Sequence, residues 1–416
     1  MARLLDRGKP VHPHRKPPSV TEAARTLRLS ALRSRITLPV AAAVFVAVVI
    51  VWMSVVHGGN RVSIWAPAAA ISGVFLLVFV LLHASPPPPR SAFWGLMALV
   101  SGGGFAMLQS LGIMPVPWPE FAANVALQVS LCAVLFLIVV RLTGHSQARS
   151  VLLLTLFTGI ALHCIWALAT DPRHATGGFI YRNGFASFAG QGGVIGLAIL
   201  AGAAGPVAAA NLRAPVAVLT LVCFAAVLAS GSRLGALSCL AGCALFTALS
   251  GPRWWHLALM LFATIVLTGA SGPVLDRIPL VNASAAERWE LYTQIWQLIR
   301  SAPLTGSGAG AFVPAFETAR SSGLPAGLSY DHAHNSYLAA WVAFGPIAGS
   351  LLFLFLLGAL ATCLRHARSC PQSRLGAAAL TMAALHASGD FTYQLPANAA
   401  LLSVALAVAL TSKAMQ

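Results

Sequence analysis

The sequence predicts an all-α, polytopic membrane protein with about twelve transmembrane helices, and two observations decide this class. Hydrophobic residues make up 58% of the 416-residue chain and charged residues only 9%, with a mean hydropathy of +0.79. A soluble domain carries about 25% charged residues, so this chain has too few to cover a water-facing surface. Apolar runs of about 20 residues, long enough to cross a bilayer as helices, recur along the chain. The composition also excludes a disordered chain, a collagen, a coiled coil and a disulfide scaffold.

The expected elements follow one another in order, beginning with a polar tail. Residues 1–35 hold nine Lys and Arg side chains and several prolines, which predicts a basic cytoplasmic tail beside anionic lipid. Nine transmembrane helices are expected over 36–272, a long loop over 273–335 and three more helices over 336–416. The twelve apolar runs are 36–57, 62–84, 91–112, 121–142, 150–170, 184–205, 214–230, 234–250, 257–272, 336–360, 376–392 and 396–411.

The basic residues predict the orientation of these helices. With the N-terminus inside, eighteen of the 26 Lys and Arg residues fall on the inner side and eight on the outer side. This is the bias that the positive-inside rule describes, so both termini are expected in the cytoplasm and the long loop outside. The net charge of +16 then reports orientation and contact with anionic lipid. We therefore expect membrane lipids as partners, and no nucleic acid.

The long outside loop contains two recognisable local structures. Ser284 and Glu287 form a capping box, which predicts a helix from Ser284 to about Arg300 that lies against the membrane surface or the helical bundle. Its expected apolar stripe is Trp289, Tyr292, Ile295, Trp296 and Ile299. The segment Pro303–Gly310 follows, and its glycines indicate either a tight turn or a backbone cradle for phosphate.

The end of this loop carries a pair of histidines, His332 and His334, between Asp331 and Asn335. Neutral imidazole titrates near pH 7 and accepts a proton from a hydroxyl, so either histidine is a candidate general base. Alternatives are a structural histidine that caps the next helix, or a metal site. A catalytic metal usually needs a third protein ligand and partners behind it, and no such set is apparent, so no metal or cofactor is expected.

Several charged residues lie at the outer ends of the expected helices, where charge is costly unless it is paired or functional. Arg233 lies in the short link between the seventh and eighth runs, Arg182 precedes the sixth, and Arg288 lies on the loop helix. Guanidinium groups suit bidentate recognition of phosphate. Alternatively, these arginines pair with outside carboxylates or reach lipid phosphates. Asp390, at the outer end of the eleventh run, either pairs with an arginine or relays protons in a transporter.

Taken in order, these motifs resemble the O-antigen ligase and polymerase superfamily of membrane glycosyltransferases. The resemblance is strongest over about 280–350, weaker over 180–240 and 385–410, and absent from the first 150 residues. The matching motifs are Gly231-Ser-Arg-Leu-Gly235, Glu287-Arg-Trp, Pro303-Leu-Thr-Gly-Ser-Gly, His334-Asn-Ser-Tyr-Leu, Phe344-Gly-Pro-Ile-Ala-Gly349 and the stretch from His386 to Pro396.

The resemblance implies an enzyme of the bacterial inner membrane that works on the periplasmic side. Such an O-antigen ligase transfers a glycan from undecaprenyl pyrophosphate to the lipid A-core, without a metal and with inversion at the anomeric carbon. The implied roles are pyrophosphate binding by Arg233 and Arg288, with Arg182 as a further candidate, and proton abstraction by His334. His332 stays open as the alternative base. Asn335 and Tyr337, which align His334 with the motif, and Asp390 are expected to support the site.

Other functions remain open at this stage. Within the superfamily, the alternatives are an O-antigen polymerase and a protein O-oligosaccharyltransferase. From another class, a flippase or transporter of lipid-linked glycans predicts polar residues within several membrane runs. The runs here are nearly free of charge and the polar motifs gather outside, which favours an enzyme.

Overall fold

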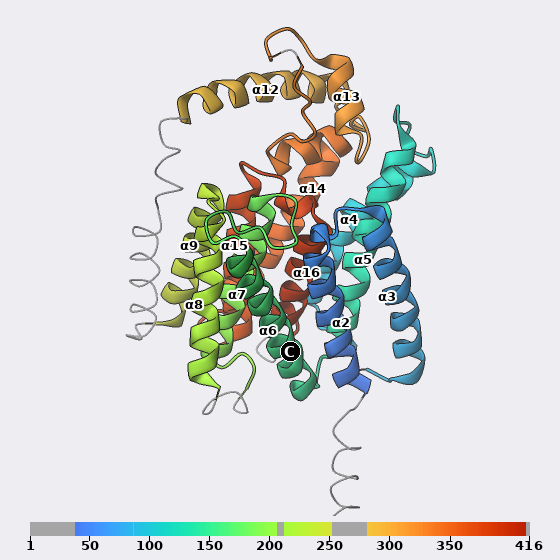
Figure 1. The fold of residues 1–416 in the computed structure, drawn as a ribbon. Helices are drawn as coiled ribbons and strands as arrows, with labels where there is room; N and C mark the ends of the chain where they lie inside the picture. Colours follow the sequence, from blue (N-terminus) through green and yellow to red (C-terminus); the bar gives the residue numbers. More distant parts are fainter. Residues whose placement is uncertain (1–37, 86, 206–211, 252–280, 326, 413–416) are drawn as a thin grey trace, which may run out of the picture. The chain divides into compact units, whose positions relative to one another are not determined.

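The computed structural model describes residues 38–85, 87–205, 212–251, 281–325 and 327–412. The chain divides into two units, Met1–Leu38 and Pro39–Gln416, and everything that follows concerns the second. Its described residues form helices and no strand, which confirms the predicted all-α class (Figure 1). The helices are α2 (Leu38–Val55), α3 (Val62–Leu82), α4 (Ala92–Ser110), α5 (Pro119–Arg141), α6 (Ser146–Thr170), α7 (Arg182–Leu200), α8 (Arg213–Ala229), α9 (Arg233–Ser250), α12 (Val281–Ser301), α13 (Phe312–Ala319), α14 (Ser336–His366), α15 (Pro371–Ala387) and α16 (Pro396–Leu410), with 3-10 turns η1 (His57–Gly59) and η4 (Thr392–Gln394).

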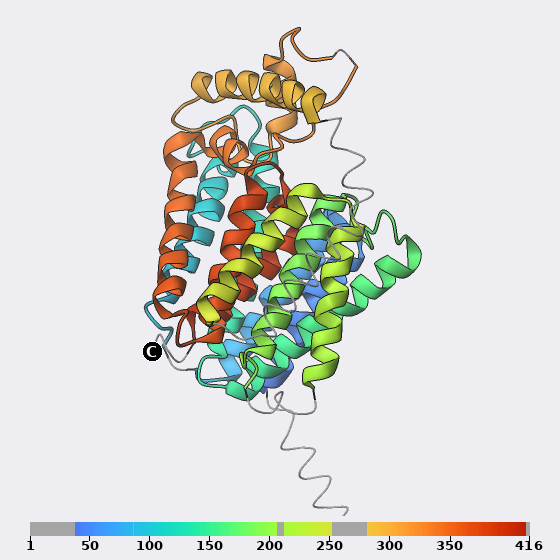
Figure 2. The same cartoon turned by 90° about the vertical axis from the view of Figure 1, so that its left-hand side faces the viewer.

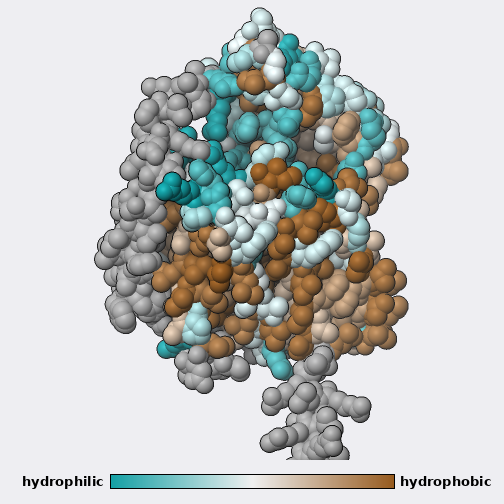
Figure 3. Space-filling model, in the orientation of Figure 1, coloured by the Kyte–Doolittle hydropathy of each residue, from teal (hydrophilic) through white to brown (hydrophobic). Residues whose placement is uncertain are grey.

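The chain is a multi-pass membrane protein. Among the described residues, eight helices are long and apolar enough to cross a membrane, namely α2, α3, α4, α5, α6, α7, α9 and α14. α8 and α16 are shorter apolar helices, and α15 spans 17 residues. The expected count of about twelve is not confirmed, and the ninth run, 257–272, lies outside the described residues. Figure 3 shows apolar side chains gathered over the bundle helices and polar ones over the end that carries α12.

α7 is the most enclosed of the membrane helices. It packs against α6, α8, α9, α15 and α16, and all of its residues from Gly184 to Ile199 are buried. Small residues let helices approach closely in a membrane. A Cβ atom on Gly193 would lie 2.2 Å from the Phe224 ring, and one on Gly190 would lie 2.8 Å from Met382. Glycines therefore let α7 lie close against α8 and α15.

The loop helix α12 crosses the end of the bundle at which α14 begins, with α13 beside it (Figures 1 and 2). Position 284 already lies inside α12, so the predicted N-cap at Ser284 is wrong. The predicted stripe is also partly wrong, because Trp289 is 76% and Trp296 is 46% exposed. The buried side is aliphatic and packs against α13 and α14. It consists of Leu291, Ile295, Leu298 and Ile299.

A tight crossing between the 303–310 segment and α14 holds this end together. α14 is kinked at Gly345, which has a φ of 76° and precedes Pro346. Gly306 faces this kink, and Ser307 donates its N–H to the carbonyl of Val342 at 2.7 Å. From α4, the buried Gln109 amide donates to the carbonyls of Thr305 and Ala343, both at 2.9 Å, and accepts from the Ala309 N–H at 2.9 Å. The segment is therefore a tight turn with its Ser307 and Ala309 N–H groups used inside the protein, which disfavours the phosphate cradle.

Replacing Gly306 by alanine is expected to destabilise the protein by about 3 kcal/mol or more. The residue has a φ of +69°, and an added Cβ would lie 2.6 Å from backbone atoms of Val342, Ala343 and Gly345. Gly104→Ala in α4 is the matched control, because nothing lies within 4 Å of its Cβ position. Thermal unfolding in detergent measures both variants. A Gly306→Ala protein as stable as the Gly104→Ala protein would contradict this packing.

Candidate functional site

The segment that precedes α14 has an unusual backbone at His334. His334 has a φ of 49°, one of two positive-φ residues other than glycine in the described chain. Such residues cost free energy and persist where their surroundings hold them, often at functional sites. The next residue, Asn335, is the N-cap of α14, and its side-chain oxygen accepts from Tyr337 N at 2.9 Å and Leu338 N at 3.1 Å. The cap of this helix is therefore Asn335, so the two histidines are not needed for capping.

The start of α14 docks on the loop that follows α15. The Asn335 side chain donates to the Ser388 carbonyl at 3.0 Å, and the Ser336 hydroxyl donates to the Asp390 carbonyl at 2.8 Å. The next residue along the chain also takes part, since the Tyr337 hydroxyl donates to the Ala384 carbonyl at 2.8 Å. Asn335 and Tyr337, expected as supporting residues, thus join α14 to α15. These contacts bring His334 to Asp390 across more than fifty residues of sequence.

Phe391 is the centre of the aromatic contacts in this region. The His332 ring stacks on it with ring centroids 3.6 Å apart and an interplanar angle of 14°. The His334 ring approaches it edge-on at 5.7 Å, and so does the Tyr181 ring at 5.1 Å. One face of His332 is therefore covered by Phe391.

Asp390 is buried and held in place by two donors. The Phe391 N–H donates to one of its carboxylate oxygens at 2.7 Å, and the Asn183 side chain at the start of α7 donates to the other. Burial raises the pKa of Asp390, while these two hydrogen bonds and the charges of His334 and Arg288 act to lower it. The carboxyl group thus links α7 to the 388–391 loop and lies within electrostatic range of His334.

The two histidines have different surroundings. Burial, together with the charge of His334, lowers the pKa of His332 to about 4, although Asp331 and a hydrogen bond with Gln394 act in the opposite direction. Burial also lowers the pKa of His334, and Asp390 opposes that effect. The Nδ1 atom of His334 is buried and has no hydrogen-bond partner among the described residues. Both imidazoles are therefore neutral at pH 7, and each is able to accept a proton.

α12 brings a positive charge to His334. Arg288 is exposed, and its charge acts on His334, Tyr292 and Asp390. One turn later on α12, the Tyr292 hydroxyl donates to the main-chain carbonyl of His334 at 3.0 Å. The site around His334 therefore contains a base, a guanidinium and a carboxyl group from three separate parts of the chain.

The other two arginines lie at helix starts that border this region. Arg182 is the exposed first residue of α7, between Tyr181 and Asn183, which contact Phe391 and Asp390. Arg233 is the half-buried first residue of α9. The neighbouring Leu234 lies against Gly389 in the 388–391 loop. The starts of α7 and α9 thus lie against the 388–391 loop, which the His334 segment also contacts.

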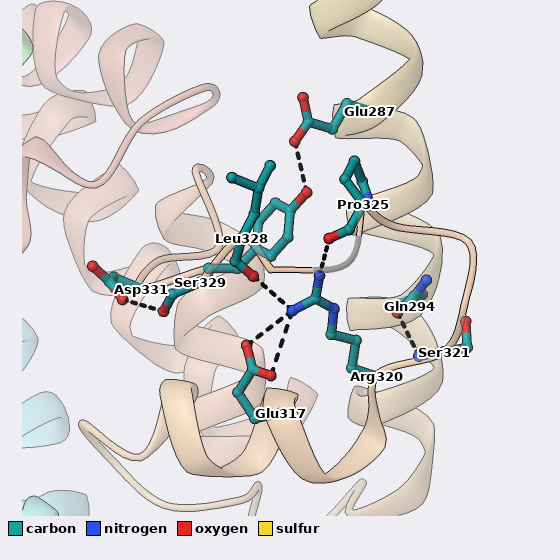
Figure 4. A network of polar contacts seen from close by, with 10 residues as sticks. Glu287, Gln294, Glu317, Arg320, Ser321, Pro325, Leu328, Ser329 and Asp331 are labelled. Atoms are coloured by element: carbon teal, nitrogen blue, oxygen red, sulfur yellow. Dashed lines mark hydrogen bonds and ion pairs between the residues drawn. The ribbon is translucent and has the colours of Figure 1, made fainter.

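A polar network holds the loop 320–331 on α12 (Figure 4). The buried Tyr330 donates its hydroxyl to Glu287 at 2.6 Å, and the Ser321 N–H donates to the Gln294 side chain at 3.0 Å. Within the loop, Arg320 donates to the Leu328 carbonyl at 2.7 Å and pairs with Glu317 at 3.4 Å. Asp331 is exposed and accepts from the Ser329 hydroxyl at 2.9 Å. Arg320 therefore has a structural role.

Residues 218–354 of the chain match the family described as O-antigen ligase. The resemblance is confirmed. The O-antigen ligase region covers about a third of the chain and implies a glycosyltransferase-like enzyme. It contains Arg233, Arg288, His332 and His334, whereas Arg182 and Asp390 lie outside it. No curated protein matches the chain.

Sequence reasoning missed four residues that shape the site, namely Tyr181, Asn183, Tyr292 and Phe391. Two of them carried usable indications. Phe391 directly follows Asp390 in a quoted motif, and Tyr292 lies four residues after Arg288, so both lie on one face of a helix. Tyr181 and Asn183 flank Arg182, but only the packed structure places them beside Phe391 and Asp390.

Proposed function

We propose that this protein is an O-antigen ligase. It transfers a glycan from undecaprenyl pyrophosphate to a sugar hydroxyl of the lipid A-core, at the periplasmic face of the bacterial inner membrane and with both termini in the cytoplasm. The observation that carries the proposal is the grouping of His334 with the charges of Arg288 and Asp390, from three separate parts of a chain whose residues 218–354 match O-antigen ligase.

The proposed reaction is a single displacement with inversion. The acceptor hydroxyl attacks the anomeric carbon, and its proton passes to His334 as the new C–O bond forms. The bond from that carbon to the pyrophosphate oxygen breaks at the same time, and undecaprenyl pyrophosphate leaves with the electron pair. Arg288, with Arg233 and Arg182, stabilises the charge that develops on this leaving group. The residues themselves supply a base and cations, so the mechanism calls for no metal or cofactor.

His334 is preferred to His332 as the base for a physical reason. The face of His332 is covered by Phe391 at 3.6 Å, and burial lowers its pKa to about 4, which makes it a weak base. His334 lies within the electrostatic range of Arg288. A base beside the guanidinium that holds the leaving group is in reach of the same anomeric carbon. Asp390 stabilises the imidazolium that forms when His334 accepts the proton.

Deletion of the chain from its host tests this function. We expect the lipopolysaccharide ladder on gels to disappear, the lipid A-core to remain, and carrier-linked polymer to accumulate, with full recovery from a plasmid copy. Core that still carries single repeats, without longer chains, would instead identify a polymerase. An unchanged ladder would contradict both assignments and lead to tests of protein glycosylation and lipid-linked glycan transport.

A further inference from the structure

The carbonyl of His334 accepts a hydrogen bond from Tyr292, a residue that has no role in the proposed reaction. Tyr292 of α12 donates its hydroxyl to that carbonyl at 3.0 Å. The acceptor belongs to the residue whose φ of 49° lies in the left-handed region. Because φ and ψ also set the direction of the Cβ atom, the rotation of this peptide decides where the imidazole points.

The left-handed conformation has to be held from outside, since it is costly for a residue with a side chain. On the C-terminal side, Asn335 is fixed as the N-cap of α14. On the N-terminal side, Ala333 is buried in the core between α12, α13 and α14. The peptide between His334 and Asn335 is held by Tyr292, because the Tyr292 hydroxyl donates a hydrogen bond to the carbonyl oxygen of that peptide.

The position of Tyr292 is fixed by the packing of α12. Its neighbours Leu291 and Ile295 are buried in the same core. The Ser321 N–H donates to the Gln294 side chain, two residues after Tyr292, and ties the 320–331 loop to α12 there (Figure 4). The hydroxyl of Tyr292 is therefore a fixed point on α12.

Arg288 lies on the same face of α12, four residues before Tyr292, and its charge acts on both Tyr292 and His334. We infer that Tyr292 is a positioning residue, which holds the left-handed peptide of His334 and aligns the imidazole with Arg288. This inference rests on the proposed function, because it assigns Tyr292 a role in that same transfer. Tyr292 acts through His334 and touches neither substrate.

The test compares two phenylalanine variants of the full chain in lipid nanodiscs. The assay supplies undecaprenyl-pyrophosphate-linked glycan as donor and lipid A-core as acceptor. Tyr292→Phe keeps the ring and removes only the hydroxyl. We expect kcat to fall by about fivefold to a hundredfold, because a lost hydrogen bond and a small misplacement of the base each reduce the rate. The KM for the donor should stay within about twofold, since Arg288 remains in place.

Tyr330→Phe is the matched control. It removes a different tyrosine hydroxyl near α12, the one that donates to Glu287, and leaves the Tyr292 bond intact. Its kcat should stay within about twofold of wild type. Thermal unfolding of both variants separates loss of stability from loss of alignment.

The pH profile adds a readout that stability alone does not move. Burial is the largest cause of the lowered pKa of His334. A released peptide exposes the imidazole, so its pKa rises and the acid limb of kcat moves to higher pH in Tyr292→Phe only. Equal losses in both variants, or an unshifted limb, would overturn the inference. If wild type is active and Tyr292→Phe matches it, the inference alone fails; if wild type transfers no glycan, the proposed function fails and the inference with it.

Discussion

Replacing His334 by alanine is expected to lower kcat for glycan transfer by about a hundredfold to ten-thousandfold, the range that a general base contributes. His334 lies beside Arg288 and Asp390, so the alanine variant keeps the cations but loses the imidazole that accepts the proton. His332→Ala should cost less than about tenfold, because that ring is stacked on Phe391 and acts by packing. Gel-based transfer assays at matched expression measure both variants.

The same histidine predicts how activity depends on pH. The base works in its neutral form, and burial places the pKa of His334 below the ordinary histidine value, which is about 6.5. Activity should therefore be level at and above pH 7 and fall only as the pH drops through the lowered pKa. A His334→Ala protein that transfers glycan at the wild-type rate, while His332→Ala does not, would reverse the assignment of the base.

Replacing Arg288 by alanine is expected to lower kcat/KM by about a hundredfold to a thousandfold, the cost of removing one group that stabilises developing charge. Arg288 is exposed on α12, so the loss does not come from a collapsed core. Arg288→Lys should recover part of the activity, because an ammonium keeps the charge but lacks the bidentate fork. Steady-state kinetics with varied donor concentration separate the effects on kcat and KM.

Arg300→Ala is the matched control for this experiment. Arg300 is also exposed and lies on the same helix, but no interaction joins it to His334 or Asp390 in the described structure. Its activity should stay within about twofold of wild type. Similar losses in the Arg288→Ala and Arg300→Ala proteins would show that the general charge of α12 matters, and that Arg288 has no specific role.

The aromatic residues of α12 show where sequence patterns stop being informative. Trp289 and Trp296 fall at the same helical spacing as Ile295 and Ile299, so periodicity assigns them all to one buried stripe. In the structure the aliphatic residues pack against α13 and α14, and both tryptophans are largely exposed. Helical spacing defines which residues share a face, but the partner that covers the helix decides which part of the face is buried.

The class of this protein can be read from its hydropathy and charge, because both act locally along the chain. An apolar run long enough for a bilayer forms a helix wherever it stands in the chain. Short motifs such as Gly231-Ser-Arg-Leu-Gly235 and His334-Asn-Ser-Tyr-Leu likewise needed only their own order to indicate the O-antigen ligase resemblance. The candidate base and the arginines could be identified from the sequence because they lie within these motifs.

How these residues meet depends on the packing of the helices. Asp390 reaches His334 because Asn335 and Ser336 bond the loop after α15, and Tyr292 reaches the His334 carbonyl because α12 packs on α14. Contacts between residues forty or more positions apart depend on helix packing and on the few hydrogen bonds that fix it. The left-handed backbone of His334 has the same origin, since this costly conformation persists only where the surrounding structure holds it.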